Sequence, residues 1–197
     1  YTMIEELKTW RADTPGCVQR IHLNNAGAAL MPRPVMQAVR THLSLENQIG
    51  GYEAAAMQKE SLSGFYDEVA RLLNGVPKNI AHATSATDAY NRALTSIPFE
   101  AGDVVLTTED DYVSNQIAFL SLQKRLKVKV VWSKVSPSGG MDLDDFEQKV
   151  KQYSPKLVAV THMPTNSGLI QDVVSAGKIC RESGAWYLVD ACQTAGQ

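Results

Sequence analysis

The chain has 197 residues, 44% of them hydrophobic, and its 19 basic and 21 acidic residues leave a formal net charge of -2. This length and composition suit one globular domain, or one domain with an arm, that buries a sizeable apolar core. A charge so close to zero gives no electrostatic reason to expect nucleic acid or a membrane surface as a partner, so we expect neither.

The cysteines and the chain ends indicate the setting of the protein. Cys17, Cys180 and Cys192 match no zinc or disulfide spacing, which favours a reducing, cytoplasmic location. No apolar run approaches the roughly 18 residues of a membrane span, and no signal peptide opens the chain. Because the sequence starts at Tyr1 and stops soon after a strong strand signal, we expect both ends to be incomplete.

The first part of the chain has helical patterns separated by breaks. Pro32 and Pro34 stand where prolines favour the start of a helix, and Gly50-Gly51 interrupts the pattern. The predicted helices cover residues 2–11, from 32–34 to about 47, and about 53–73. We therefore expect an N-terminal arm and helix in residues 1–50 and a partial large domain in residues 51–197.

The rest of the chain alternates between short apolar runs and helical patterns. The predicted strands are residues 79–84, 103–107, 127–132, 157–161 and 186–189, and the predicted helices are 86–96, 113–125, 142–152 and 173–183. Continuous apolar strands that alternate with helices are typical of a mostly parallel sheet with both faces covered. The sequence therefore predicts an α/β fold, a three-layer sandwich.

Candidate site residues follow these strands, because ligands of open α/β sheets bind at the carboxyl ends of the strands. The segment Ser85-Ala86-Thr87 opens a helix, where free N–H groups, a hydroxyl and the helix dipole suit a phosphate. The alternative is that Ser85 is an ordinary N-cap.

Asp190 directly follows the apolar run Trp186–Val189. A carboxylate there can pair with a buried cation, such as a protonated pyridine nitrogen. The alternative is a solvated aspartate that caps the next turn. No acidic or histidine cluster with ligand spacing accompanies Asp190, so no metal site is predicted.

Further polar and aromatic groups occupy other loops after strands. Asn166 and Gln193 could bind a ring hydroxyl, or could simply stabilise their loops. Tyr112 could stack on a flat ring, or could cover the edge of the sheet. Each group is ambiguous alone, but in chain order they supply an anion site, a stacking ring, hydroxyl binders and a partner for a cation.

These segments resemble those of the class V aminotransferase-fold enzymes, which use pyridoxal 5'-phosphate (PLP). This group includes cysteine desulfurases, kynureninase-like hydrolases and isopenicillin N epimerase-like proteins. The resemblance rests on residues 22–27 (HLNNAG), 84–89 (TSATDA), 161–168 (THMPTNSG) and 189–197 (VDACQTAGQ). It implies a large cofactor domain of the PLP-dependent transferase fold, incomplete at its C-terminus, an amino-acid substrate and a homodimer at full length.

The resemblance also implies which residues bind the cofactor. Ala86 and Thr87 would hold its phosphate, and Asp190 would pair with its ring nitrogen. Asn166 and Gln193 would approach its ring hydroxyl. Tyr112 would stack on the ring where desulfurases usually have histidine, which favours the epimerase-like or hydrolase-like branches.

The lysine that forms the Schiff base in this family is not found in the chain. In the family it follows the segment matched here by residues 189–197, whereas Lys156 and Lys178 precede Asp190. We therefore assign no catalytic residue, and we expect a fragment of a PLP-dependent enzyme that acts on an amino acid. The alternative is a PLP-fold binding or scaffold protein without catalysis. Another α/β nucleotide enzyme is disfavoured, because no Gly-x-Gly-x-x-Gly or Walker-type loop occurs.

Overall fold

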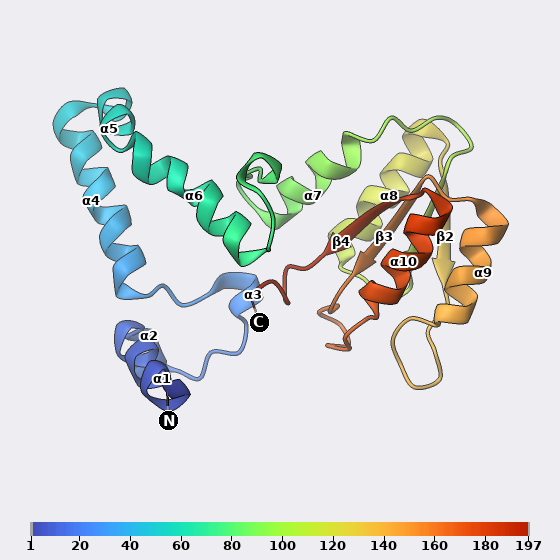
Figure 1. Ribbon diagram of the computed structural model, residues 1–197, viewed down its shortest axis with the longest axis horizontal. Helices are drawn as coiled ribbons and strands as arrows, with labels where there is room; N and C mark the ends of the chain where they lie inside the picture. The colour runs from blue at the N-terminus through green and yellow to red at the C-terminus, as the bar shows by residue number, and fades with distance from the viewer. Residues whose placement is uncertain (1, 197) are drawn as a thin grey trace. The chain divides into compact units, whose positions relative to one another are not determined.

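The computed structural model describes residues 2–196, with side chains from Glu5 onward. The chain divides into two compact units, Tyr1–Ala81 and His82–Gln197 (Figure 1). We describe each unit by itself. The division predicted from the sequence, at residues 50 and 51, stays a prediction.

The first unit is entirely helical. Its elements are α1 (Thr2–Asp13), α2 (Gly16–Gln19), α3 (Asn25–Ala28), α4 (Arg33–Ile49), α5 (Gly51–Met57), α6 (Lys59–Leu72) and the 3₁₀ helix η1 (Pro77–Asn79). The single helix predicted for residues 53–73 is two helices. Gln58 leaves the helical conformation, at φ -98° and ψ 13°, and α6 starts after it.

The first unit buries little of its apolar surface. Among its described residues, the hydrophobic side chains that are buried are those of Ala54 and Ala70. Val18, Ile21 and Leu23 are exposed by 83%, 90% and 91%. The helices of this unit are therefore amphipathic elements without a large apolar core of their own.

The second unit is built on a parallel sheet, as the sequence predicted. Its strands are β1 (Val104–Thr108), β2 (Lys129–Ser133), β3 (Leu157–Thr161) and β4 (Trp186–Asp190), in the order β2-β1-β3-β4. All neighbouring strands pair in parallel. Every residue of β1 and of β3 is buried, as expected for central strands that are covered on both faces.

The strand predicted for residues 79–84 does not form. Residues 77–79 make the 3₁₀ helix η1, and Ile80 is extended, at φ -96° and ψ 130°. A strand requires a hydrogen-bonding neighbour, and in the described part of the chain no strand pairs with this segment. The segment is therefore extended at Ile80 but does not join the sheet.

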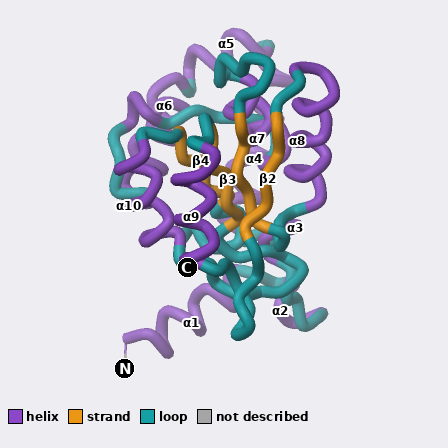
Figure 2. The backbone as a smooth tube through the Cα atoms, turned by 90° about the vertical axis from the view of Figure 1, so that its right-hand side faces the viewer, coloured by secondary structure: helices purple, strands orange, loops and turns teal. Residues whose placement is uncertain are grey.

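Helices cover both faces of the sheet (Figure 2). On one face α7 (Ala86–Thr95) and α8 (Val113–Leu126) pack through Leu94, Phe119 and Leu122. On the other, α9 (Leu143–Tyr153) and α10 (Val173–Ser183) pack through residues that include Phe146 and Ala176. This arrangement is the predicted three-layer sandwich. The predicted cap of α9 is also present, since Asp142 Oδ1 accepts from Asp145 N–H at 3.0 Å.

The strand order places a topological switch point between β1 and β3. From β1 the chain continues to β2 on one side, whereas β3 continues to β4 on the other. The carboxyl ends of neighbouring strands on either side of such a point frame the ligand crevice of α/β folds. The loops that carry Tyr112 and Asn166 start at these ends, and the loop that carries Gln193 starts at the end of the neighbouring β4. Ala86 and Thr87 were predicted to follow a strand, but they open α7 after a segment that forms none.

The packing of α8 can be tested with a matched pair of substitutions. Leu122 is 4% exposed and Leu120 is 53% exposed on the same helix. We expect Leu122→Ala to lower the free energy of unfolding by about 2–5 kcal/mol, because it leaves a cavity in the core. Leu120→Ala should stay within about 0.5 kcal/mol of wild type. Urea denaturation followed by circular dichroism measures both, and equal losses would contradict the described orientation of α8.

Candidate functional site

Asp190 ends β4, and both oxygens of its carboxylate are held by donors. Oδ2 accepts from Asn115 Nδ2 at 3.0 Å, and Oδ1 accepts from the Cys192 N–H at 3.0 Å. Asp190 pairs in register with Thr161, the last residue of β3. The carboxylate is thus half-buried and fixed at the carboxyl edge of the sheet.

A second carboxylate, Asp111, lies just after β1 and is 4% exposed. Its Oδ1 accepts from Asn115 Nδ2 at 3.1 Å, from the Tyr112 N–H at 2.7 Å and from the Thr161 hydroxyl. Its Oδ2 accepts from Gln116 Nε2 at 3.0 Å. Burial raises the pKa of Asp111 above its ordinary value, although these hydrogen bonds act in the opposite direction.

The hydrogen bonds around Asp111 extend to the far strand of the sheet. Gln116 Oε1 accepts from the indole Nε1 of Trp132 in β2 at 3.0 Å. A continuous path of side-chain hydrogen bonds therefore runs from Trp132 through Gln116, Asp111 and Asn115 to Asp190. It joins the two outer strands of the described sheet.

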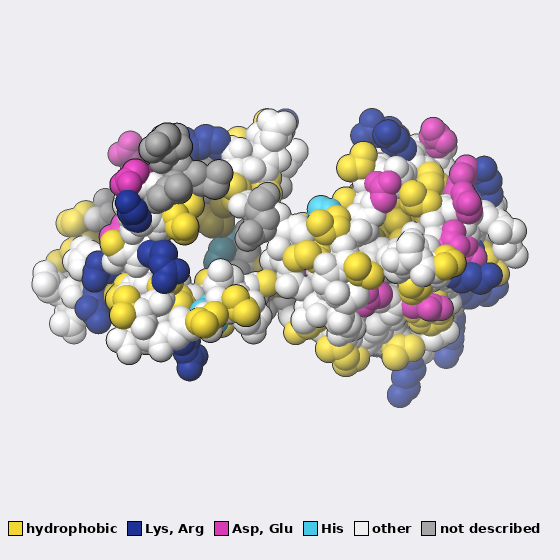
Figure 3. Space-filling model, turned by 90° about the horizontal axis from the view of Figure 1, so that it is seen from below, with side chains coloured by type: hydrophobic (Ala, Val, Ile, Leu, Met, Phe, Trp, Pro, Cys, Tyr) yellow, Lys and Arg dark blue, Asp and Glu magenta, His cyan; other side chains and the backbone are white. Residues whose placement is uncertain are grey.

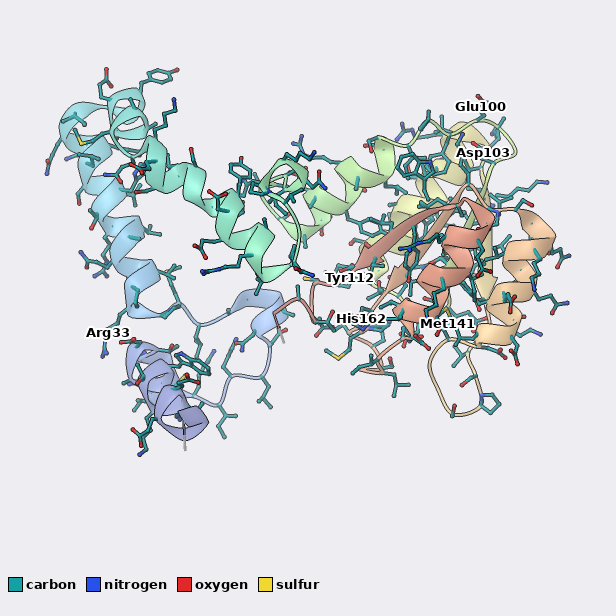
Figure 4. The ribbon with its side chains drawn as sticks, in the orientation of Figure 1. Arg33, Glu100, Asp103, Tyr112, Met141 and His162 are labelled. Atoms are coloured by element: carbon teal, nitrogen blue, oxygen red, sulfur yellow. The ribbon has the colours of Figure 1, made fainter. Side chains whose placement is uncertain are left out.

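The predicted residues Tyr112, Asn166 and Gln193 lie in the loops after β1, β3 and β4. Tyr112 is the N-cap residue of α8, and its side chain is 44% exposed. Figure 4 places it at the same end of the unit as His162, opposite Glu100 and Asp103. An exposed ring at this end is available for stacking on a flat ligand.

The two predicted amides also connect the loops. Asn166 Nδ2 donates to Asp111 O at 3.3 Å, and Gln193 Nε2 donates to Met163 O at 3.1 Å and to Thr165 Oγ1 at 2.8 Å. Both side chains therefore stabilise their loops, which was the alternative interpretation of each residue. Their role in binding a ligand stays a prediction, because these hydrogen bonds use the amide nitrogens and not the carbonyl oxygens.

The start of α7 combines a capped end with a potential anion site. Ser85 Oγ accepts from the Asp88 N–H at 3.1 Å, so Ser85 is an N-cap. The N–H groups of Ala86 and Thr87 precede the first intrahelical hydrogen bonds, and nothing in the described structure accepts from them. Both residues are exposed. Two N–H groups at the positive end of a helix dipole are suited to a phosphate.

Tyr90 brings α7 close to the two carboxylates. It lies one turn after Thr87, and its ring packs edge-on against Phe119 with centroids 6.3 Å apart. Burial, together with the Asp111 and Asp190 carboxylates, raises the pKa of Tyr90 far above its ordinary value, so the phenol stays protonated. The start of α7 and the two carboxylates therefore lie in one region of the second unit.

Asp111, Asn115 and Tyr90 were not predicted as site residues. Asn115 occurs four residues after Asp111, so the two meet across one helical turn. That spacing is the sequence signal that could have identified Asn115, and the structure shows it to be buried in α8. Its contact with Asp190 depends on the strand order, which the local sequence does not contain.

Comparison with known proteins identifies the family. Residues 21–197 match the family model for aminotransferase class-V. The chain belongs to this family. A probable cysteine desulfurase of Pyrococcus abyssi is 29% identical over 197 residues, 94% of this chain and 47% of that protein. One of Methanothermobacter thermautotrophicus is 30% identical over 190 residues, with the same shares covered.

Solved structures agree with the family assignment. The apo cysteine desulfurase of Thermococcus onnurineus has a TM-score of 0.80 at 25% identity, and the match covers 92% of this chain and 46% of that one. The cystine C-S lyase C-DES, solved with its product cysteine persulfide, shares the fold with a TM-score of 0.83 at 18% identity, covering 93% and 50%. A C-DES variant of the same fold contains glycine covalently linked to its PLP cofactor. The chain spans about half the length of the curated relatives it matches.

The surface of this class-V domain carries mixed charge. On the face of the second unit seen in Figure 3, acidic and basic side chains are interspersed with hydrophobic ones, and neither sign dominates. No helix within residues 2–196 is long and apolar enough to span a bilayer. The same residues contain no cluster of three or more side chains arranged to hold a metal ion.

The raised pKa of Asp111 predicts a pH dependence of stability. An aspartate in an unfolded chain has a pKa of about 3.9. The pKa of Asp111 is higher in the folded state than in the unfolded chain. Its protonated form therefore stabilises the fold fully below the unfolded pKa, and this stabilisation is lost as pH rises through the folded pKa. From about pH 4 upward, the unfolding free energy of wild type should therefore fall relative to that of Asp111→Asn. Urea titrations over that range measure the difference, and parallel pH curves would contradict the prediction.

Proposed function

We propose that this chain is part of a PLP-dependent enzyme that acts on an amino acid, with cysteine as the substrate. The observation that carries the proposal is the Asp190 carboxylate, held by two donors at the carboxyl end of β4 in a class-V fold. When bound, PLP supplies an electron sink that stabilises negative charge at the substrate carbon. The residues of this chain hold and orient that group.

Asp190 would provide the partner for a protonated ring nitrogen. Its oxygens are fixed by Asn115 and by the Cys192 N–H, so the carboxylate needs little reorganisation when it meets a cation. A carboxylate in this position keeps the facing nitrogen protonated. The half-buried position of Asp190 limits screening by water.

The other predicted residues would bind the remaining parts of the cofactor. The N–H groups of Ala86 and Thr87, with the Thr87 hydroxyl, would donate hydrogen bonds to the phosphate. Tyr112, whose ring is 44% exposed, would cover one face of the pyridine ring. Asn166 and Gln193 would approach the ring hydroxyl, and the carbonyl oxygen of one of them would accept its single hydrogen, while their nitrogens keep the loops in place.

The relatives support desulfurase chemistry over the other branches of the family. Those reported above are named cysteine desulfurases. They weigh against the epimerase-like and hydrolase-like branches that Tyr112 favoured in the sequence. We further propose a homodimer at full length, as the resemblance implies, and a cytoplasmic location, which the odd number of cysteines supports.

The decisive experiment uses the full-length protein. We expect purified full-length protein to be yellow from bound PLP and to lose that colour on treatment with borohydride. With dithiothreitol added as the reductant, it should convert cysteine to alanine and sulfide. Analytical ultracentrifugation of the same sample should give a dimer. A colourless protein that fails to take up added PLP would refute the enzyme and favour the non-catalytic scaffold.

The role of Asp190 can be tested against a matched aspartate. Asp190→Asn removes the charge that would pair with the ring nitrogen, so we expect PLP affinity to fall about 10- to 100-fold. The control is Asp144→Asn, in the first turn of α9, where the aspartate is exposed. Fluorescence titration of the apo proteins with PLP measures both. Equal affinity of Asp190→Asn and wild type would remove Asp190 from the site.

A further inference from the structure

We propose that Asn115 is a positioning residue that fixes the Asp190 carboxylate, and that Asp111 orients Asn115 for this purpose. Asn115 Nδ2 lies between the two carboxylates, 3.1 Å from Asp111 Oδ1 and 3.0 Å from Asp190 Oδ2. It is 2% exposed, so no bulk water can replace its hydrogen bonds. Both residues would act through Asp190, without touching a ligand themselves.

The chemistry of a primary amide explains why asparagine suits this place. Its nitrogen carries two hydrogens, whereas an ionised carboxylate only accepts. One hydrogen can therefore serve each aspartate, and the Thr161 hydroxyl at 3.5 Å is a weaker third contact. The reversed amide would place its carbonyl oxygen against two carboxylates, which is strongly unfavourable.

Asp111 is held firmly enough to set the direction of the amide. Besides Asn115, it accepts from the Tyr112 N–H at 2.7 Å, from Gln116 Nε2 at 3.0 Å and from the Thr161 hydroxyl. With Asp111 fixed on one side, the second amide hydrogen of Asn115 can only point toward Asp190. The buried Asp111 carboxylate, on the loop after β1, thus sets the orientation of Asp190 through Asn115.

The groups that face Asn115 come from three elements. Asp111 precedes α8, Asp190 ends β4, and Thr161 ends β3. The phenol of Tyr90 in α7 interacts with both carboxylates and stays protonated. Two of the three are acceptors when ionised, so the arrangement needs a donor between them. Under the proposed function, on which this part of the inference rests, the donor preorganises Asp190 for a cation.

The first test requires no cofactor. Crystal structures of the full-length apo protein would be compared for wild type, Asn115→Leu and Thr161→Val. Asn115→Leu removes the donor to Asp190, so we expect the Asp190 carboxylate to rotate or to take several conformers. Thr161→Val removes a donor to Asp111 but keeps the Asn115 contact, so Asp190 should stay as in wild type. An unchanged Asp190 in Asn115→Leu would overturn the inference, even if the protein binds no PLP.

The second test reverses the donor. In Asn115→Asp an ionised carboxylate would repel Asp190, whereas a protonated one could donate its single hydrogen to it. Relative to wild type at the same pH, we expect the PLP affinity of Asn115→Asp to be about 10- to 100-fold weaker at about pH 8 and to recover at about pH 5.5. Asn115→Leu should be weakened equally at both values.

These outcomes separate positioning from a merely structural role. If Asn115 only fills space, Asn115→Asp and Asn115→Leu should lose affinity alike and without pH dependence, which would overturn the inference. Thermal melting at both pH values identifies variants that do not fold. If Asn115→Leu is unfolded, the pH-dependent recovery of Asn115→Asp decides alone. Failure of wild type to bind PLP would refute the proposed function, and the apo structures would still decide the positioning of Asp190.

Discussion

The contact between Asn115 and the two carboxylates is the constraint on which the rest of the site depends. Two negative groups held this close are unfavourable unless a donor separates them and fixes their geometry. Asn115 lies in α8, which packs on one face of the sheet, yet it reaches Asp190 at the end of β4. This contact therefore requires that α8 packs on its face of the sheet, that the strands follow their observed order and that Asp190 points toward Asn115.

The sequence predicted the elements that depend on local patterns. The helix 173–183 and the strand 157–161 were predicted with the bounds that the structure has, because their apolar periodicity and flanking caps are unambiguous. Asp190 was identified as a candidate because a carboxylate follows a continuous apolar run. The strand predicted at 79–84 failed because an extended segment becomes a strand only through a partner.

The parts of the site that sequence could not predict are those that cross strands. Asn115 follows β1, whereas Asp190 ends β4, and β3 lies between these strands in the sheet. Only the sheet order shows that a side chain on α8 can reach across β3. The pairing of Asp111 with Thr161 has the same origin, since residues 50 positions apart meet through the parallel ends of β1 and β3.

The outer edge of β4 has a consequence for handling this chain. β4 pairs with β3 on one side, and no strand within the described residues pairs with its other side. Trp186, at the start of β4, is 62% exposed. An unpaired strand with apolar side chains is a template for adding strands from other molecules. β4 is therefore, like β2 on the other side of the sheet, an edge at which strands of other molecules can add. A charge placed near the start of β4 would oppose that addition without touching the carboxylates at the opposite end of the strand.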